Sequence, residues 1–271
     1  MKDQLFGNTA AATLALLLLM GCAGDPVEER LKELGGIDKE KRSLAEDALV
    51  ELGSAAAPQL TAALESGGKK TRSSSARVLG KIGDRSAVAP LIAALSDDER
   101  EVREEAARSL GKLGDAAAVA PLVEVLADEN KWVRLQVAAA LGELGNRGAV
   151  EPLAAALQDA DWQVRLKAAW ALGELKDPRA VVPLVSSLAD RGWQIREQAA
   201  AALGELADAR AVDSLAVALR GDRDETVRAK AAWALGQVKD ARARDALTAA
   251  LTDVNESVRS NAEKALAGLD E

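Results

Sequence analysis

One short phrase recurs along the chain at an almost fixed interval, and this repeat constrains the fold more than any other feature. The phrase is a branched apolar residue followed by arginine, and it returns five times after Val102-Arg103 with steps of 31, 31, 31, 32 and 31 residues. The later copies are Val133-Arg134, Val164-Arg165, Ile195-Arg196, Val227-Arg228 and Val258-Arg259, and Thr71-Arg72 extends the series backward by one step. A period of about 20–50 residues is typical of solenoids, whose units pack only on their neighbours.

One unit, residues 148–175, shows how each repeat is built. Its first helix is expected over residues 149–158, because Pro152 then falls in the first turn, where a missing N–H costs little. The second helix is expected over residues 161–175, with Val164, Ala168, Leu172 and Leu175 on one apolar stripe. Neither helix buries its stripe alone, so the repeats must stack.

The composition agrees with a helical array. Hydrophobic residues make up 48% of the chain but aromatic residues only 2%, and the abundant alanine, leucine, glutamate, lysine and arginine are strong helix formers. We therefore predict an all-α fold, a right-handed α-solenoid (superhelix) of about eight helix pairs over residues 27–271. The first pair, residues 27–52, follows the pattern least well.

The pattern Val-Arg-x-x-Ala-Ala-x-x-Leu-Gly, which the copies follow with small changes, resembles the HEAT-like repeat of the phycobilisome-lyase class. The resemblance covers nearly everything from residue 27 onward. It implies that aspartates six residues before the repeat arginines form a structural ladder between neighbouring repeats and not an acid/base site. These aspartates are Asp97, Asp128, Asp159, Asp190, Asp222 and Asp253.

Catalysis is not expected. The chain has no histidine and no tyrosine, and its one cysteine is Cys22, so His-based acid/base chemistry, Ser/His or Cys/His pairs and His- or Cys-ligated metals are excluded. The resemblance extends to deoxyhypusine hydroxylase, whose iron is held by His-Glu motifs, and that activity does not carry over here. Bilin lyases act on cytoplasmic pigment proteins, which disagrees with the export signal described below. We expect no enzyme activity, no cofactor and no metal.

Nucleic acid is not an expected partner either. The net charge of −8 opposes binding to phosphates, and it argues against the HEAT-like DNA glycosylases. The densest basic stripe, Lys69 to Lys81, has no aromatic residue and is interpreted as a solvated helix face.

The N-terminus is interpreted as a lipoprotein sorting signal. An apolar run of eleven residues from Ala10 to Met20 suits a signal peptide and is too short to span a bilayer. It ends in Leu19-Met20-Gly21-Cys22, which resembles the bacterial lipobox. The resemblance implies a signal peptide over residues 1–21, a lipidated Cys22 and a short tether over residues 22–26. Ala23 after the cysteine implies the outer membrane, facing the periplasm. The alternative is a soluble protein with an apolar start.

The five tryptophans all belong to the second helices of four consecutive repeats. Helical-wheel angles place Trp132, Trp170 and Trp233 on the side away from the core, the concave surface of a solenoid, and Trp162 and Trp193 at its boundary. Tryptophans on a polar face are typical binding hot spots. The predicted partner site comprises Trp132, Leu135, Trp162, Gln163, Leu166, Lys167, Trp170, Trp193, Gln194 and Trp233. We predict a scaffold that holds a protein or peptide there; the alternative is a carbohydrate-binding protein or enzyme that uses the rings as stacking platforms.

Overall fold

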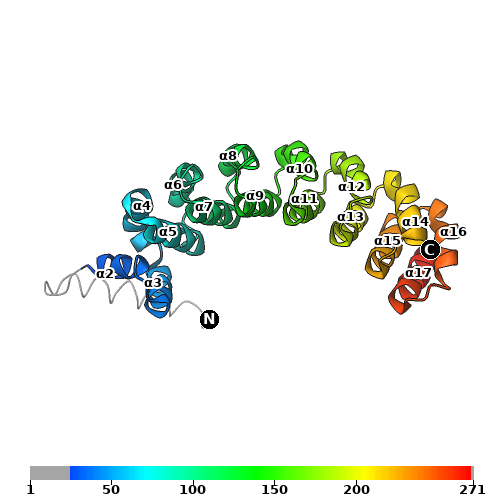
Figure 1. The fold of residues 1–271 in the computed structure, drawn as a ribbon, viewed down its shortest axis with the longest axis horizontal. Helices are drawn as coiled ribbons and strands as arrows, with labels where there is room; N and C mark the ends of the chain where they lie inside the picture. The colour runs from blue at the N-terminus through cyan, green and yellow to red at the C-terminus, as the bar shows by residue number, and fades with distance from the viewer. Residues whose placement is uncertain (1–24, 270–271) are drawn as a thin grey trace, which may run out of the picture. The chain divides into compact units, whose positions relative to one another are not determined.

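The computed structural model describes residues 25–269, where the chain forms α-helices and short 3-10 turns and no strand. Within this range the helices follow one another as eight pairs (Figure 1). We call the first helix of each pair outer and the second inner. The outer helices are α2 (Pro26–Leu34), α4 (Ala57–Ser66), α6 (Val88–Ala94), α8 (Val119–Val125), α10 (Val150–Ala156), α12 (Val181–Ser187), α14 (Val212–Gly221) and α16 (Arg244–Ala250). The inner helices are α3 (Lys39–Leu52), α5 (Lys69–Ile82), α7 (Arg100–Leu113), α9 (Lys131–Leu144), α11 (Trp162–Leu175), α13 (Trp193–Leu206), α15 (Glu225–Val238) and α17 (Glu256–Leu269).

These pairs confirm the predicted all-α solenoid and its number of repeats. The predicted signal peptide and Cys22 lie outside the described residues. Among the helices that are described, none combines the length and the apolar character needed to cross a bilayer.

The described part of the chain divides into two compact units, the first ending at Val125 and the second beginning at Leu126. In the second unit each inner helix packs on the next, from α9 through α11, α13 and α15 to α17, and the outer helices α10, α12, α14 and α16 each contact their own inner helix. In the first unit α5 packs on α7 in the same way.

The core of the second unit is built from the repeat positions that the sequence singles out. Of this unit's leucines seven residues after the repeat arginines, four are fully buried: Leu141, Leu172, Leu203 and Leu235. Burying each leucine stabilises the fold by about 1.5–3 kcal/mol. Small residues let the inner helices approach closely, since a methyl group added at Gly173 of α11 would lie 3.0 Å from Cβ of Ala202 in α13.

The repeat arginines and aspartates form the predicted ladder. Arg165 donates from Nε and Nη2 to the two carboxylate oxygens of Asp190 in the next repeat, and its Nη1 donates to the backbone carbonyl of Asp159 in its own repeat. The corresponding pairs are Arg72–Asp97, Arg134–Asp159, Arg196–Asp222 and Arg228–Asp253, with Nε–O distances of 2.7 to 2.8 Å. Each of these five pairs ties one repeat to the next within its unit by two charge-assisted hydrogen bonds.

The ladder keeps its carboxyl groups ionised. Burial alone would raise the pKa of Asp159, but the Arg134 guanidinium and the backbone N–H of Asp161 outweigh it and hold that pKa below its usual range. The same balance lowers the pKa of Asp190. These carboxylates therefore stay ionised and hydrogen-bonded to their arginine partners, which is a structural role and not that of a general acid or base.

The six inner helices from α5 to α15 end in the left-handed conformation whether or not glycine is present. Gly83, Gly114 and Gly145 have φ values of 79°, 67° and 64°, as expected for glycine after a helix. The repeats that lack this glycine use the same turn, with φ of 47° at Lys176, 49° at Ala207 and 54° at Lys239. The sequence leaves open whether these turns differ, and the structure shows that they accept left-handed strain.

The polar residue after each turn caps a 3-10 turn that leads into the outer helix. Asp84 and Asp177 each accept a hydrogen bond from the backbone N–H two residues later. Pro178 takes the first position of its 3-10 turn, Pro178–Ala180. Asp84 and Asp177 thus cap the 3-10 turns and not the α-helices that follow.

Candidate functional site

All five tryptophans lie in the second unit, on the inner helices α9, α11, α13 and α15. Trp132, Trp162 and Trp193 are exposed, with 39%, 43% and 41% of their surface accessible. Trp170 and Trp233 are half-buried. This order differs from the helical-wheel expectation, in which Trp170 and Trp233 point most directly to solvent and Trp162 and Trp193 lie at the boundary.

The reason is the neighbouring inner helix, which a single-helix projection does not include. A methyl group added at Gly142 of α9 would lie 2.9 Å from Cζ3 of Trp170 in α11, and one at Gly204 of α13 would lie 2.5 Å from Cζ3 of Trp233 in α15. Each ring edge therefore rests on a glycine of the preceding inner helix. Trp170 and Trp233 therefore each pack against the preceding repeat with one ring edge and remain partly exposed to solvent.

A lysine lies over the face of three of these rings. The Lys167 Nζ is 4.4 Å from the centroid of Trp170, and the Lys230 Nζ is 5.2 Å from that of Trp233. Both pairs come from the same heptapeptide, Lys-Ala-Ala-Trp-Ala-Leu-Gly, at 167–173 and 230–236, because residues three apart share a helix face. The contacts contribute about 0.5–2 kcal/mol each.

The third lysine–tryptophan pair is built differently. Lys131 precedes Trp132 in α9, and its Nζ lies 4.8 Å from the ring centroid. The same ammonium group also pairs with Asp161 at 2.8 Å. Lys131 is therefore neutralised within the protein.

The remaining predicted site residues lie on the same helices. Leu135 of α9, Leu166 of α11, Gln163 of α11 and Gln194 of α13 are half-buried. Together with the exposed rings they give α9, α11 and α13 a surface of aromatic, aliphatic and amide groups. We call the inner-helix surface formed by the predicted site residues the tryptophan face.

Sequence reasoning missed a pocket at the C-terminal end of this face. Its volume is about 370 Å³, and it lies among α13, α15 and α17. The lining residues are Glu197, Glu225, Thr226, Ala229, Lys230, Trp233, Asn255, Ser257 and Asn261. The sequence contains a signal for two of these residues, since Lys230 and Asn261 each stand two residues after a repeat arginine, the register of the predicted Lys167.

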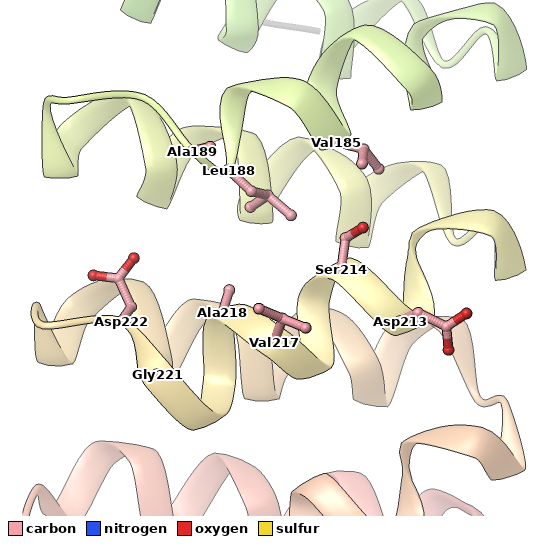
Figure 2. A pocket seen from close by; sticks show the side chains of 9 residues that line it. All are labelled: Val185, Leu188, Ala189, Asp213, Ser214, Val217, Ala218, Gly221 and Asp222. Atoms are coloured by element: carbon pink, nitrogen blue, oxygen red, sulfur yellow. The ribbon is translucent and has the colours of Figure 1, made fainter.

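A second pocket, of about 480 Å³, opens between the outer helices α12 and α14 (Figure 2). Its walls are mostly apolar, with Val185 and Leu188 on one side and Val217 and Ala218 on the other (Figure 2). It occurs at the one step of 32 residues in the repeat series, where α14 has ten residues and α12 has seven. The 32-residue step in the sequence is the feature from which an irregular spacing at this repeat could have been predicted.

The other charged clusters have structural explanations. In the first unit the basic stripe is matched by acids, with Arg77 2.8 Å from Glu46 and Lys69 2.9 Å from Glu99. No group of acidic side chains in the described part of the chain is arranged to hold a metal ion. The predicted lipidation site, Cys22, cannot be placed, because it lies outside the described residues.

A stack of helix pairs tied by an arginine–aspartate ladder, with side chains displayed on one helix row, defines an α-solenoid repeat protein. The sequence profile of HEAT repeats matches residues 57–132, 119–203 and 181–267. The chain therefore belongs to the HEAT repeat family. A search of curated protein sequences found no match.

Solved structures share the architecture. The YibA protein of Escherichia coli is similar over 95% of this chain and 96% of its own, with 22% identity and a TM-score of 0.68. An engineered protein is similar over 90% of this chain and 78% of its own, with 23% identity and a TM-score of 0.58. The complex of CpcE and CpcF of phycocyanin lyase from a Nostoc species covers 90% of this chain and 94% of its own, at 25% identity and a TM-score of 0.48. The first two comparisons support the fold, and none of the three assigns an activity.

Proposed function

We propose that this protein is a scaffold whose tryptophan face binds a protein or an extended peptide. The observation that carries the proposal is the exposure of Trp132, Trp162 and Trp193 on three successive inner helices. Tryptophans that are large, rigid and partly exposed form the anchors of many interfaces. Leu135 and Leu166 lie between them in the same helices and add aliphatic surface, so the face suits a partner with apolar side chains.

The carbohydrate alternative has less support. Sugar stacking needs an open ring face, and lysines lie over the rings of Trp132, Trp170 and Trp233. Trp162 and Trp193 carry no such cation among the described residues and are the rings on which a sugar would stack. Titration with soluble oligosaccharides, followed by quenching of tryptophan fluorescence, distinguishes a carbohydrate ligand from a peptide ligand. Saturable quenching that is abolished in Trp162→Ala and in Trp193→Ala would favour the carbohydrate.

The proposed location is the bacterial cell envelope, with Cys22 lipidated and the repeats facing the periplasm. This proposal rests on the sequence at residues 19–22 and on the position of the one cysteine in the chain. Cys22→Ser removes the thiol that accepts the lipid, so the variant is expected to leave the membrane fraction or to remain uncleaved. A variant that fractionates with membranes like the parent protein contradicts lipid anchoring.

The binding proposal is tested by replacing the exposed rings together. The partner is captured by crosslinking in cells, purified and titrated against the parent protein and the double variant Trp162→Ala/Trp193→Ala. Each hot-spot tryptophan contributes about 2 kcal/mol or more to a complex, so the affinity should fall at least tenfold. Val182→Ala is the matched control, because Val182 is 63% exposed on the outer helix α12. Equal losses in the control and the double variant contradict the proposal.

A further inference from the structure

Three half-buried charged side chains of the second unit stand out because no oppositely charged side chain within the described residues forms an ion pair with them. They are Lys167 on α11, Glu197 on α13 and Lys230 on α15. The repeat arginines on the same helices all have carboxylate or carbonyl partners, and Lys131 pairs with Asp161. A partly buried charge without a counter-charge is unfavourable. A ligand that supplies the opposite charges would recover this energy.

The three groups alternate in sign along successive inner helices: positive on α11, negative on α13 and positive on α15. The two lysines are held in position, since each ammonium group lies over a tryptophan ring whose edge is fixed against a glycine of the preceding helix. Glu197 and Lys230 line the same pocket. Glu225 also lines it, but Glu225 is exposed and lies five residues before Lys230, more than one helical turn away.

Amide groups on the same face can bind a peptide backbone. Gln198 and Asn261 occupy the register of Lys167 and Lys230 on the helices α13 and α17. The Asn261 Nδ2 donates to the backbone carbonyl of Ala229 at 2.9 Å, which fixes the side chain and leaves Oδ1 to accept from a ligand N–H. The Gln198 amide makes no hydrogen bond within the described part of the chain.

The spacing of the charges sets a peptide register. Packed helices lie about 8–10 Å apart. A peptide in the extended polyproline II conformation advances about 3.1 Å per residue with three residues per turn, so side chains three residues apart point to the same side. Consecutive inner helices are therefore about three peptide residues apart, and Lys167 and Lys230 about six.

We propose that the partner segment is an extended peptide that presents an acidic, a basic and an acidic side chain at intervals of about three residues, to Lys167, Glu197 and Lys230 respectively. This inference rests on the proposed function, because it assumes that the tryptophan face binds peptide. It adds the charge pattern that the peptide must carry and its position along α11, α13 and α15.

The test is selection from a displayed library of random 12-residue peptides against the purified chain. The parent protein is compared with the triple charge reversal Lys167→Glu/Glu197→Lys/Lys230→Glu. Because loss of the lysine–tryptophan contacts can weaken the fold, Glu197→Lys alone is a second variant that keeps both lysines. Thermal melts confirm that each variant is folded. Trp162→Ala/Trp193→Ala provides the background selection.

We expect the parent protein to enrich peptides with the acidic–basic–acidic pattern and the triple reversal to enrich the inverse pattern. Glu197→Lys should replace the central basic residue with an acidic one and weaken the parent's peptides by about tenfold, as for a charged hydrogen bond. Enriched peptides without this charge periodicity, or with the same pattern in Glu197→Lys, would overturn the inference and leave the proposed function standing. Enrichment no greater than in the tryptophan variant would contradict both.

Discussion

The three inner helices that end without glycine offer a direct test of backbone strain. Ala207 has φ 49° and ψ 37°, and a residue with a Cβ in this conformation costs about 1–2 kcal/mol. Glycine removes that cost but gives the unfolded chain more conformational freedom, worth about 0.4–1 kcal/mol. Ala207→Gly should therefore stabilise the protein by about 1 kcal/mol, and Lys176→Gly and Lys239→Gly by a similar amount. For a chain of this size, that raises Tm by about 2–4 °C per substitution.

The reverse substitution has a well-matched control. An added methyl group at Gly145 (φ 64°) or at Gly221 meets no atom within 4 Å, and only Gly145 has positive φ. Gly145→Ala should lower Tm by about 2–4 °C, whereas Gly221→Ala should leave it unchanged or slightly raised. Thermal unfolding followed by circular dichroism measures all five variants. Equal effects at Gly145 and Gly221, or a lower Tm for Ala207→Gly, would refute the assignment of strain to these turns.

Three further predictions follow from the packing and the charges. Trp170→Ala should lower the free energy of unfolding by about 2–4 kcal/mol, at least about 1 kcal/mol more than Trp162→Ala, because the Trp170 ring rests on Gly142; equal losses in denaturant titrations would contradict this. The ladder carboxyls have folded-state pKa values below their ordinary ones. The stability that they provide is therefore fully present above the unfolded pKa of about 3.9 and is lost as the pH falls through the lower folded-state pKa values. A Tm that stays constant from pH 6 to pH 2.5 would contradict the ladder's role. Glu263 is exposed where inner repeats carry a buried alanine such as Ala169, so Glu263→Ala should promote self-association at high concentration, and sedimentation that shows an unchanged monomer would count against a capping role.

The fold was predictable because the same physical requirement recurs in each repeat. A typical inner helix such as α11 must bury a leucine, Leu172, and bind its arginine, Arg165, to an aspartate of the next repeat. One period of the sequence therefore predicts both the helix order and the ladder. The left-handed ends at Lys176 and Ala207 were not predictable, because local propensity opposes them and the packing of the following repeat overrides it.

The candidate site was predictable in its helices but not in its details. Periodicity places Trp170 on the face away from its own core, but the ring's burial depends on Gly142 of a different helix. The contact between Lys167 and Trp170 could be predicted from the sequence, because residues three apart share a helix face. The lack of an ion-pair partner for Glu197 depends on which side chains the neighbouring helices bring near it, and the repeat pattern does not determine this.

The central claim is that a partner occupies the tryptophan face, and site-specific photo-crosslinking in cells tests it most directly. A photoreactive amino acid is placed at Gln163 on α11 or Gln194 on α13, and, as the control, at Ala155, which is exposed on the outer helix α10. We expect a discrete crosslinked product at positions 163 and 194 that is lost with Trp162→Ala/Trp193→Ala, and none at position 155. A product at position 155 alone, or products at 163 and 194 that persist in the double variant, would contradict the claim.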